Sequence, residues 1–406
     1  MKQSILLLSG IGISSLGDFI YLVAINILVL NLTGSPAAVA GLWIISPIAA
    51  LLTKVWSGSL IDRVNNRRLM IILDISRALL VFILPFLTSI WFIYLILFGL
   101  SICKAFFEPA SMKYITSLIP KGDRKRFNSF RSMLTSGAFL VGPAISGVLL
   151  LLSSVHVAIW INAASFLVSA YFLYLLPNVD SAPTNSSTVQ LGLNILKRDW
   201  LDVLDFSKNH LFVITIYSLF QLFMVVALGM DTQEVVFTQK VLHLSETDFG
   251  LLISITGIGS ILGATTVSLF AHKLSIRSLM WLGFAFVAIG YLIYAFSFSF
   301  WSVAFGFIIL GFFNSFSSTG FMTFYQNNIP VSIMGRVSSI FGMFQSVSQI
   351  FFILLIGFTG EVIPLRYSII GASILILAIS IMAILLLFKN KYQEFLEEER
   401  DITKIN

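Results

Sequence analysis

Two acidic side chains and one basic side chain lie inside long apolar stretches, where an ionisable group could bind and release a proton. Asp18 follows about 13 mostly apolar residues, which brings it close to the middle of a membrane-spanning helix. Lys104 and Glu108 are four residues apart and share one helix face, where they could pair and separate when a ligand binds. The alternatives are an Asp18 whose hydrogen bonds only hold two helices together and a Lys104–Glu108 pair that stays closed.

Four further charges occupy apolar stretches. Asp74 and Arg77 also share a helix face, and we interpret them as a structural ion pair on the cytoplasmic side, near a gate. Lys54 could reach the inner interface or pair with one of these acids. Lys113 lies nearer the inner surface, and its amine is expected to extend to the interface.

The composition excludes a soluble protein. Apolar residues make up 57% of the 406 residues and charged residues 11%, against about 25% charged residues in soluble proteins. The lone Cys103 cannot form an internal disulfide, the His residues form no ligand cluster, and no GxxxxGK[ST] phosphate loop occurs. We therefore expect no metal, no cofactor, no ATP hydrolysis and no catalytic residues. The net charge of +6 indicates orientation in a membrane rather than nucleic-acid binding.

Twelve apolar stretches are long enough to cross a bilayer, which takes about 20 residues each. They run over 5–30, 36–60, 69–88, 91–118, 128–152, 156–177, 210–231, 246–270, 279–299, 301–327, 337–360 and 366–388. The first is too long for a signal peptide and is expected to span the membrane. Loops on one side carry most of the basic residues, whereas the other side has only Lys240 and Arg366. The sequence predicts an all-α protein of a bacterial-type cytoplasmic (plasma) membrane, with both termini in the cytoplasm.

The chain resembles itself when it is shifted by 210 residues. Pro120 and Arg126 fall on Pro330 and Arg336, in corresponding loops, and no gap is needed over the second to fifth stretches. Two parallel six-helix halves with a central site are a transporter architecture, in which one half rocks against the other.

This repeat predicts four segments. They are an N-terminal six-helix bundle (1–177), a linker (178–208), a C-terminal six-helix bundle (209–388) and a cytoplasmic tail (389–406). The second part of the linker has the apolar spacing of an amphipathic helix. That helix could lie on the inner membrane surface or pack against the bundle.

The loop between the second and third stretches carries a dense motif. It reads Gly58-Ser-Leu60-Ile-Asp62-Arg63-Val-Asn-Asn-Arg67-Arg68. Gly58 allows close helix approach, and Asp62 can accept from a helix N-terminus or a neighbouring Arg. Such contacts could hold one conformation and break in another, or the basic residues could serve topology alone. The loop resembles the GxLxDRxxxRR signature of the major facilitator superfamily, and the second half keeps His272, Lys273 and Arg277.

A second motif lies in the fifth stretch. Gly142-Pro143-Ala-Ile-Ser146-Gly147 is similar to the GPxxGG motif of proton-coupled antiporters, with Ser146 in place of the first paired Gly. Gly and Pro inside a helix bend it and let a neighbour approach closely. A plain packing kink is the alternative.

Further stretches narrow the resemblance. Ser15-Leu-Gly17-Asp18, Leu32-Thr33-Gly34-Ser35 and Phe107-Glu108-Pro109-Ala110 look like the macrolide-efflux and siderophore- or peptide-export group of that superfamily. The resemblance implies export of a small molecule in exchange for protons by a chain that is expected to be monomeric. Its Asp18, Lys104 and Glu108 would handle protons and substrate.

The C-terminal half differs in its polar residues. Within its apolar stretches Gln221, Asn314 and Gln345 are neutral, and with Tyr21 they are expected to form a hydrogen-bonding pocket wall. An uptake carrier or a lipid or lysolipid flippase of the same fold remains an alternative. A sensor or membrane enzyme would need a signalling domain or catalytic cluster, and the sequence shows neither.

Overall fold

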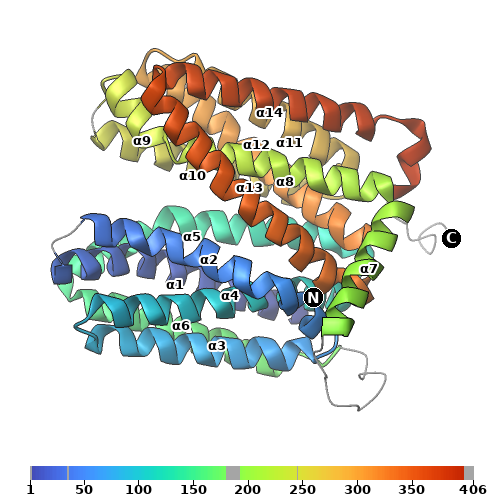
Figure 1. Ribbon diagram of the computed structural model, residues 1–406, viewed down its shortest axis with the longest axis horizontal. Helices are drawn as coiled ribbons and strands as arrows, with labels where there is room; N and C mark the ends of the chain where they lie inside the picture. The colour runs from blue at the N-terminus through green and yellow to red at the C-terminus, as the bar shows by residue number, and fades with distance from the viewer. Residues whose placement is uncertain (1, 34–35, 180–192, 245, 397–406) are drawn as a thin grey trace. The chain divides into compact units, whose positions relative to one another are not determined.

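The computed structural model describes residues 2–33, 36–179, 193–244 and 246–396, and the regular elements in these ranges are helices joined by short loops (Figure 1). The long helices are α1 (Lys2–Thr33), α2 (Pro36–Ile61), α3 (Asn66–Ile83), α4 (Ile90–Leu118), α5 (Arg124–Leu152), α6 (Val155–Leu175), α7 (Leu193–Asn209), α8 (Leu211–Asp231), α10 (Glu246–Leu269), α11 (Ile276–Ala295), α12 (Phe300–Asn328), α13 (Met334–Val362) and α14 (Leu365–Leu387). The short ones are η1 (Leu84–Phe86), η2 (Lys121–Asp123), α9 (Glu234–Val236), η3 (Phe237–Val241), η4 (Val331–Ile333) and η5 (Asn390–Phe395).

The long helices have the composition of membrane spans. Eleven of them in the described ranges are long and apolar enough to cross a bilayer, and α2 adds a shorter apolar stretch, Ile45–Lys54. Helices suit a bilayer because they satisfy their backbone hydrogen bonds internally. Side chains cap several helix starts: Asn65 accepts from the backbone of Arg68 before α3, and Ser154 caps α6. The prediction of an all-α membrane protein is confirmed.

The helix bounds repeat at the offset found in the sequence. α4 and α12 start and end 210 residues apart, as do α5 and α13. The short η2 and η4 also correspond, and each follows a proline, Pro120 or Pro330. The same local signals therefore produce the same chain path twice.

The chain divides into two compact units. Unit 1 comprises Met1–Ile119, Gly137–Asp205 and Pro330–Met343, and unit 2 comprises Pro120–Ser136, Phe206–Ile329 and Phe344–Asn406. Each unit thus includes the first part of a helix from the other half of the sequence. The start of α13 belongs to unit 1 and the start of α5 to unit 2.

Each unit is built on close helix pairs. In unit 1, α1 and α3 pack on α6, while α2 and α3 pack on α4. The core between them contains fully buried small and branched residues such as Ala24, Val29 and Ala158. In unit 2, α12 packs on α10 and α11, and α14 packs on α8 and α11. A Cβ at Gly263 would lie 2.0 Å from the carbonyl oxygen of Phe312, so the α10–α12 contact depends on glycine.

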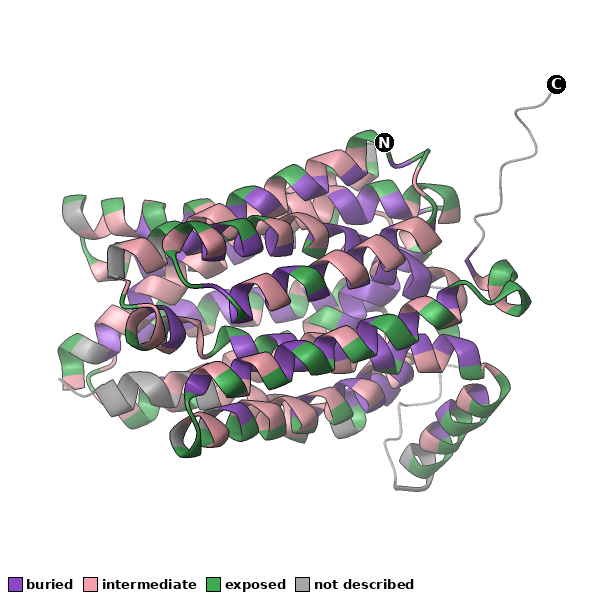
Figure 2. Cartoon of the chain, turned by 90° about the horizontal axis from the view of Figure 1, so that it is seen from above, coloured by how far each residue is buried: buried purple, intermediate pink, exposed green. Residues whose placement is uncertain are grey.

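α7 is the amphipathic helix expected in the linker. Asp199, Val203 and Phe206 are buried, whereas most other described side chains of the helix are exposed (Figure 2). Its buried face packs on the helical bundle, which is one of the two arrangements anticipated from the sequence. The preceding linker residues, 180–192, and the tail beyond 396 lie outside the described residues.

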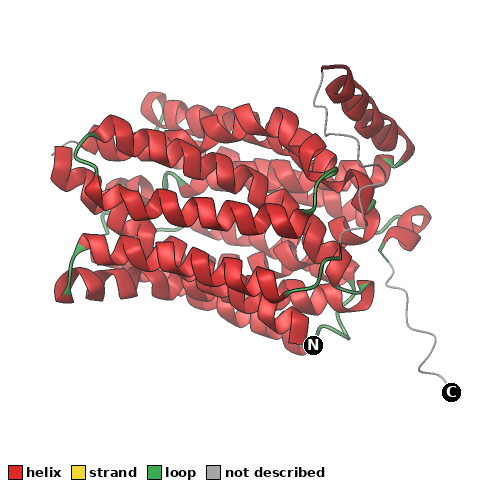
Figure 3. Cartoon of the chain, turned by 90° about the horizontal axis from the view of Figure 1, so that it is seen from below, coloured by secondary structure: helices red, strands yellow, loops and turns green. Residues whose placement is uncertain are grey.

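Some local structure departs from the predicted spans. α5 begins at Arg124 rather than at 128, since the short η2 turns the chain directly into it. Figure 3 shows that the described elements are helices joined by loops and turns. Between α8 and α10 the chain forms α9 and the π-helix η3, which no pattern in the sequence indicated.

Candidate functional site

Asp18 lies where α1 touches α6. A Cβ at the preceding Gly17 would lie 2.2 Å from Ser165 Oγ and 2.6 Å from Asn162 Oδ1, so the two helices are in direct contact. Asp18 itself is half-buried beside Asn162, with Arg77 and Lys104 as the cations in electrostatic range. The carboxyl therefore has a polar neighbour and charges of both signs, since Glu108 is also in electrostatic range, inside an apolar bundle.

The predicted pair of Asp74 and Arg77 is present on α3. The guanidinium donates to the carboxylate, and both side chains are buried. The Arg77 guanidinium also lies 4.1 Å from the ring centre of Phe107 and 4.3 Å from that of Phe166. These contacts fix a positive charge next to α4 and α6.

Lys104 and Glu108 are close enough for a weak ion pair. Lys104 Nζ lies 3.8 Å from Glu108 Oε1, and the two side chains are 61% and 62% exposed. Exposed pairs of this kind contribute little stability and separate easily. Lys54, on α2, donates instead to the carbonyl of Gly342 on α13 at 3.1 Å, with Glu108 as the acid in electrostatic range.

The residues proposed for a pocket wall are spread over both units. Tyr21 belongs to unit 1, and its buried hydroxyl has no hydrogen-bond partner in the described chain. In unit 2, Gln221 donates to the hydroxyl of Tyr217 at 3.1 Å, Asn314 is exposed and Gln345 is half-buried. Their role in a common pocket stays a prediction.

The antiporter-type motif packs α5 against α1 beside Asp18. A Cβ at Gly142 would lie 2.5 Å from Phe19 Cβ, and Ser146 Oγ donates to the carbonyl of Ile20 at 3.0 Å. Pro143 lies between them, inside the helix. Gly147 has open space instead, because nothing lies within 4 Å of a Cβ built there. The expected close approach therefore occurs at Gly142 and not at Gly147.

Asp62 is the centre of a buried charge network at the end of α2. Its Oδ1 accepts from the backbone N–H of Gly335 at 3.0 Å, and its Oδ2 accepts from the N–H and Nε of Arg336, both at 3.1 Å. Asp62 thus makes both contacts expected from the sequence, with a helix start and with an Arg. The carboxyl ties α2 to the beginning of α13.

Lys113 also joins this network. Its side chain is buried and its Nζ lies 3.2 Å from Asp62 Oδ1 and 3.3 Å from the carbonyl of Ile61. The expectation that its amine extends to the interface is wrong. The physical reason is that a buried carboxylate lies within reach, and pairing with it satisfies the ammonium without a path to water.

α7 supplies two more carboxylates. Asp199 accepts from both Nη atoms of Arg63 at 2.7 Å and from Arg336 Nη1 at 3.1 Å, while Asp202 accepts from Arg336 Nη1 at 2.7 Å. We call the set Asp62, Arg63, Lys113, Asp199, Asp202 and Arg336 the charge network. Its three cations and three anions balance, and they join α2, α4, α7 and α13 within unit 1.

The other basic residues of the motif have different roles. Arg67 donates to the carbonyl of Leu176, which ties α3 to the end of α6. Arg68 contributes its backbone N–H to the Asn65 cap, and its side chain is exposed.

The two buried aspartates of the network differ in their pKa. Burial raises the pKa of Asp62 above its ordinary value, and the charges of Lys113 and Arg336 only partly offset it. For Asp199, burial also acts to raise the pKa. Hydrogen bonds from Arg63 and Ser59 and the charges of Arg63 and Arg336 outweigh burial and hold the pKa below its ordinary value.

These shifts predict a pH optimum for the network. The raised pKa means that Asp62 binds a proton more tightly inside the network than in water. The packing of α2 on α13 should therefore become stronger as the pH falls from the raised pKa of Asp62 to its ordinary pKa. The lowered pKa means that Asp199 stabilises the network as a carboxylate. This stabilisation is lost as the pH falls from the ordinary pKa of Asp199 to its lowered pKa. We expect the α2–α13 contact at Asp62 to be strongest under mildly acidic conditions, and α7, which Asp199 holds, to loosen in stronger acid.

Spin labels at two exposed positions would test this, one at Lys197 on α7 and one at Arg68 on α3, in a chain with Cys103→Ser. The distribution of distances between the two labels should broaden only at the acidic end of the pH range, and Asp199→Asn should remove that broadening. A distance distribution that is the same from neutral to strongly acidic pH would contradict the assignment.

Gly58 permits the contact on which the network rests. A Cβ there would lie 2.5 Å from the carbonyl oxygen of Gly335 and 2.8 Å from Arg336 Cα. Gly58→Ala should therefore force α2 and α13 apart and destabilise the purified protein by about 1–3 kcal/mol, read as a lower melting temperature. Gly147→Ala is the matched control, because space is open around Gly147. Equal melting temperatures for the two variants would disprove the importance of the contact.

Sequence reasoning missed a polar cluster in unit 2. The hydroxyl of Tyr291 donates to Asp231 Oδ1 at 2.8 Å at the end of α8. Glu234 follows on α9, where burial and the charge of Asp231 raise its pKa. The second half therefore carries acids at the end of α8 and on α9 in addition to the neutral polar residues expected within its spans. A count of acids in the loops with few basic residues could have found this pair.

Comparison with known families decides what kind of protein carries these features. The profile described as Major Facilitator Superfamily matches residues 7–352 and 223–400. The chain belongs to this superfamily. It is a multi-pass membrane protein of a transporter family rather than of an enzyme family.

Two relatives in Bacillus species share part of this transporter's sequence. An uncharacterised MFS-type transporter, YfiS of Bacillus subtilis (strain 168), is 29% identical over 207 residues, which are 48% of this chain and 50% of YfiS. A protein named provisionally as the bacilysin exporter BacE, from Bacillus amyloliquefaciens, is 26% identical over 271 residues, 64% of this chain and 65% of BacE. The matches thus span half to two thirds of these relatives.

The fold is shared more widely than the sequence. The human organic anion transporter MFSD10 (TETRAN) superposes with a TM-score of 0.76 over 95% of this chain and 98% of its own, at 14% identity. At this identity the likeness concerns the fold alone.

Proposed function

We propose that this transporter exports a small amphipathic molecule, of the antibiotic or siderophore-like class, in exchange for protons. The similarity to BacE over 271 residues carries the proposal, because that relative is named for antibiotic export. The proposal extends to orientation: the chain acts as a monomer in a bacterial-type cytoplasmic membrane, with both termini in the cytoplasm. The concentration of basic loops on one side supports this orientation.

Asp18 is the proton carrier in this proposal. A half-buried carboxyl beside Asn162 can change its charge without leaving the bundle, and its proton affinity depends on Arg77 and Lys104 nearby. Lys104 is held only weakly by Glu108, so a bound substrate could pair with the Lys104 ammonium instead. The electrostatic potential at the Asp18 carboxyl would then change. Proton release and substrate binding would then exclude each other, which is what antiport requires.

The charge network fits the gating role. Its contacts join helix ends within unit 1, and several must break if α13 is to move away from α2. Alternating access requires contacts that hold one state and are lost in the other.

Transport into inverted vesicles tests the function. Vesicles with an acidic lumen are offered bacilysin, a macrolide, a fluorescent dye and an iron chelator, while uptake and lumenal pH are followed together. Uptake of one compound with matched proton loss supports antiport, and vesicles without the protein and a protonophore serve as controls. Movement that ignores the gradient would favour a lipid or lysolipid flippase or facilitated diffusion, and movement with the protons would favour an uptake carrier.

A further inference from the structure

The internal repeat places a second arginine in the position of Arg336. At the offset of 210 residues Arg336 corresponds to Arg126, Asp62 to His272 and Gly58 to Ser268. In unit 1 the arginine faces three carboxylates. In unit 2 the counterpart of the central aspartate is a histidine, so the equivalent arginine lacks that anion.

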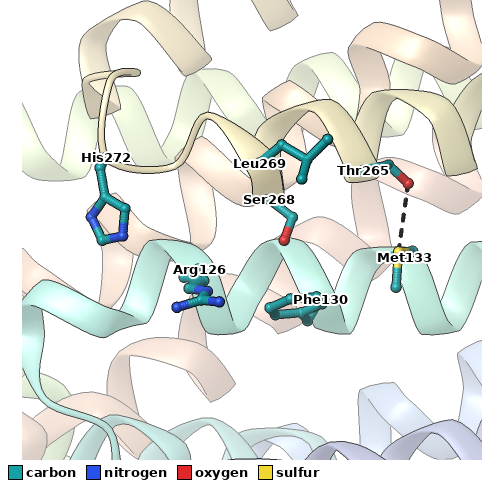
Figure 4. Close-up of a pocket in the computed structure, with 7 residues that line it drawn as sticks. All are labelled: Arg126, Phe130, Met133, Thr265, Ser268, Leu269 and His272. Atoms are coloured by element: carbon teal, nitrogen blue, oxygen red, sulfur yellow. Dashed lines mark hydrogen bonds between the residues drawn. The ribbon is translucent and has the colours of Figure 1, made fainter.

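A cavity of about 290 Å³ occupies this place in unit 2, between α5 and α10. Figure 4 shows Ser268 and His272 extending from α10 and the following turn toward α5, which carries Arg126 and Phe130. Its lining is completed by Met133, Thr265 and Leu269. A Cβ at Gly58 would clash with the backbone of Gly335 and Arg336 in unit 1, whereas unit 2 carries Ser268 at the corresponding position, where it lines the cavity.

The basic residues beside Arg126 are used for structure. Arg124 donates to the carbonyl of Gln326 at 2.6 Å, and Lys125 donates to that of Leu274 at 2.5 Å. The exposed guanidinium of Arg126 has only the ring of Phe130, 5.7 Å away, among its contacts in the described part of the chain. Arg126 can therefore bind an anion from outside.

We propose that this cavity binds the phosphate headgroup of an anionic phospholipid. The guanidinium fork suits phosphate oxygens, and the hydroxyl of Ser268 and the ring of His272 add donors at the same place. The exposed Leu269 and Phe270 next to the cavity offer apolar surface to the acyl chains. Basic pockets between spanning helices near a membrane surface bind such headgroups. The lipid phosphate would supply the anion that Asp62 and Asp199 supply in unit 1.

Native mass spectrometry of the purified protein tests the site. Wild-type protein is titrated in detergent with phosphatidylglycerol, with phosphatidylcholine and with inorganic phosphate. Phosphatidylglycerol should bind in preference to phosphatidylcholine, and Arg126→Ala should weaken its binding about fivefold. His272→Asp should weaken it similarly, since the new carboxylate would face Arg126 as Asp62 faces Arg336.

The controls keep the outcome unambiguous. Lys273→Ala removes a charge from the same turn but outside the cavity, and should leave lipid binding unchanged. Arg126→Lys should recover most of the binding, which separates charge from folding.

Wild-type affinity in both Arg126→Ala and His272→Asp would overturn the proposal, as would an equal loss in Lys273→Ala. Inorganic phosphate binding as tightly as the lipid would refute the lipid assignment. The site is independent of the transported substrate, so failure of the export assay leaves it standing.

Discussion

Asp18→Asn is expected to abolish gradient-driven transport while leaving the protein folded. Asn keeps the size and hydrogen-bonding capacity of the side chain beside Asn162 but cannot bind or release a proton. Uptake into vesicles with an acidic lumen should fall to the rate of vesicles without the protein. Exchange of substrate for substrate, which moves no net proton, should continue.

Two further variants define what the result means. Asp18→Glu retains a titratable carboxyl and should keep part of the driven transport, whereas Asp123→Asn removes an exposed acid of the short helix η2 and should keep all of it. Normal driven transport by Asp18→Asn would remove Asp18 from the coupling mechanism. The carboxyls of Asp231 and Glu234 would then be the next candidates, because they form the acidic cluster in unit 2.

The helical fold could be predicted almost completely from the sequence. Runs of apolar residues separated by Gly, Pro and basic residues specify membrane helices with few structural alternatives, since a bilayer admits no irregular lipid-exposed backbone. The repeat was visible because Pro120 and Pro330 mark equivalent turns. The sequence did not indicate that the start of α13 packs in unit 1. The contacts that place it there join residues more than 270 positions apart in the chain.

Parts of the site followed from local chemistry. Asp62 lies at a helix end next to a glycine, so its contacts with a helix start and an arginine were foreseeable. The role of Asp199 was not, since its place on an amphipathic helix gave no hint that its carboxylate would be buried against Arg63. Lys113 was assigned to the interface for a similar reason. Burial of a long charged side chain depends on a partner that only the tertiary structure brings close.

Arg336→Gln is expected to disrupt the charge network and reduce transport more than tenfold. Arg336 is the shared donor of Asp62, Asp199 and Asp202, so its loss leaves Asp62 with Lys113 and Asp199 with Arg63. Removing one partner from a buried ion pair costs about 3–5 kcal/mol, which corresponds to a shift of at least about a hundredfold between two conformations. The packed arrangement of α2 and α13 should therefore become a minor state.

Chemical access to Ser339 reports this opening. Ser339 is buried and its hydroxyl lies 3.0 Å from that of Ser57, so Ser339→Cys in a chain that also carries Cys103→Ser should resist a thiol reagent until α13 leaves α2. Arg336→Gln should expose it, while Lys197→Gln on the exposed face of α7 should not.

A double-mutant cycle with Asp62→Asn then separates gating from general damage. If the two groups act as one contact, the double variant should lose less than the sum of the two single losses, because each single variant already breaks the Asp62–Arg336 contact. Full additivity of the two losses, or wild-type transport by Arg336→Gln with Ser339 still protected, would mean that the network serves only membrane topology.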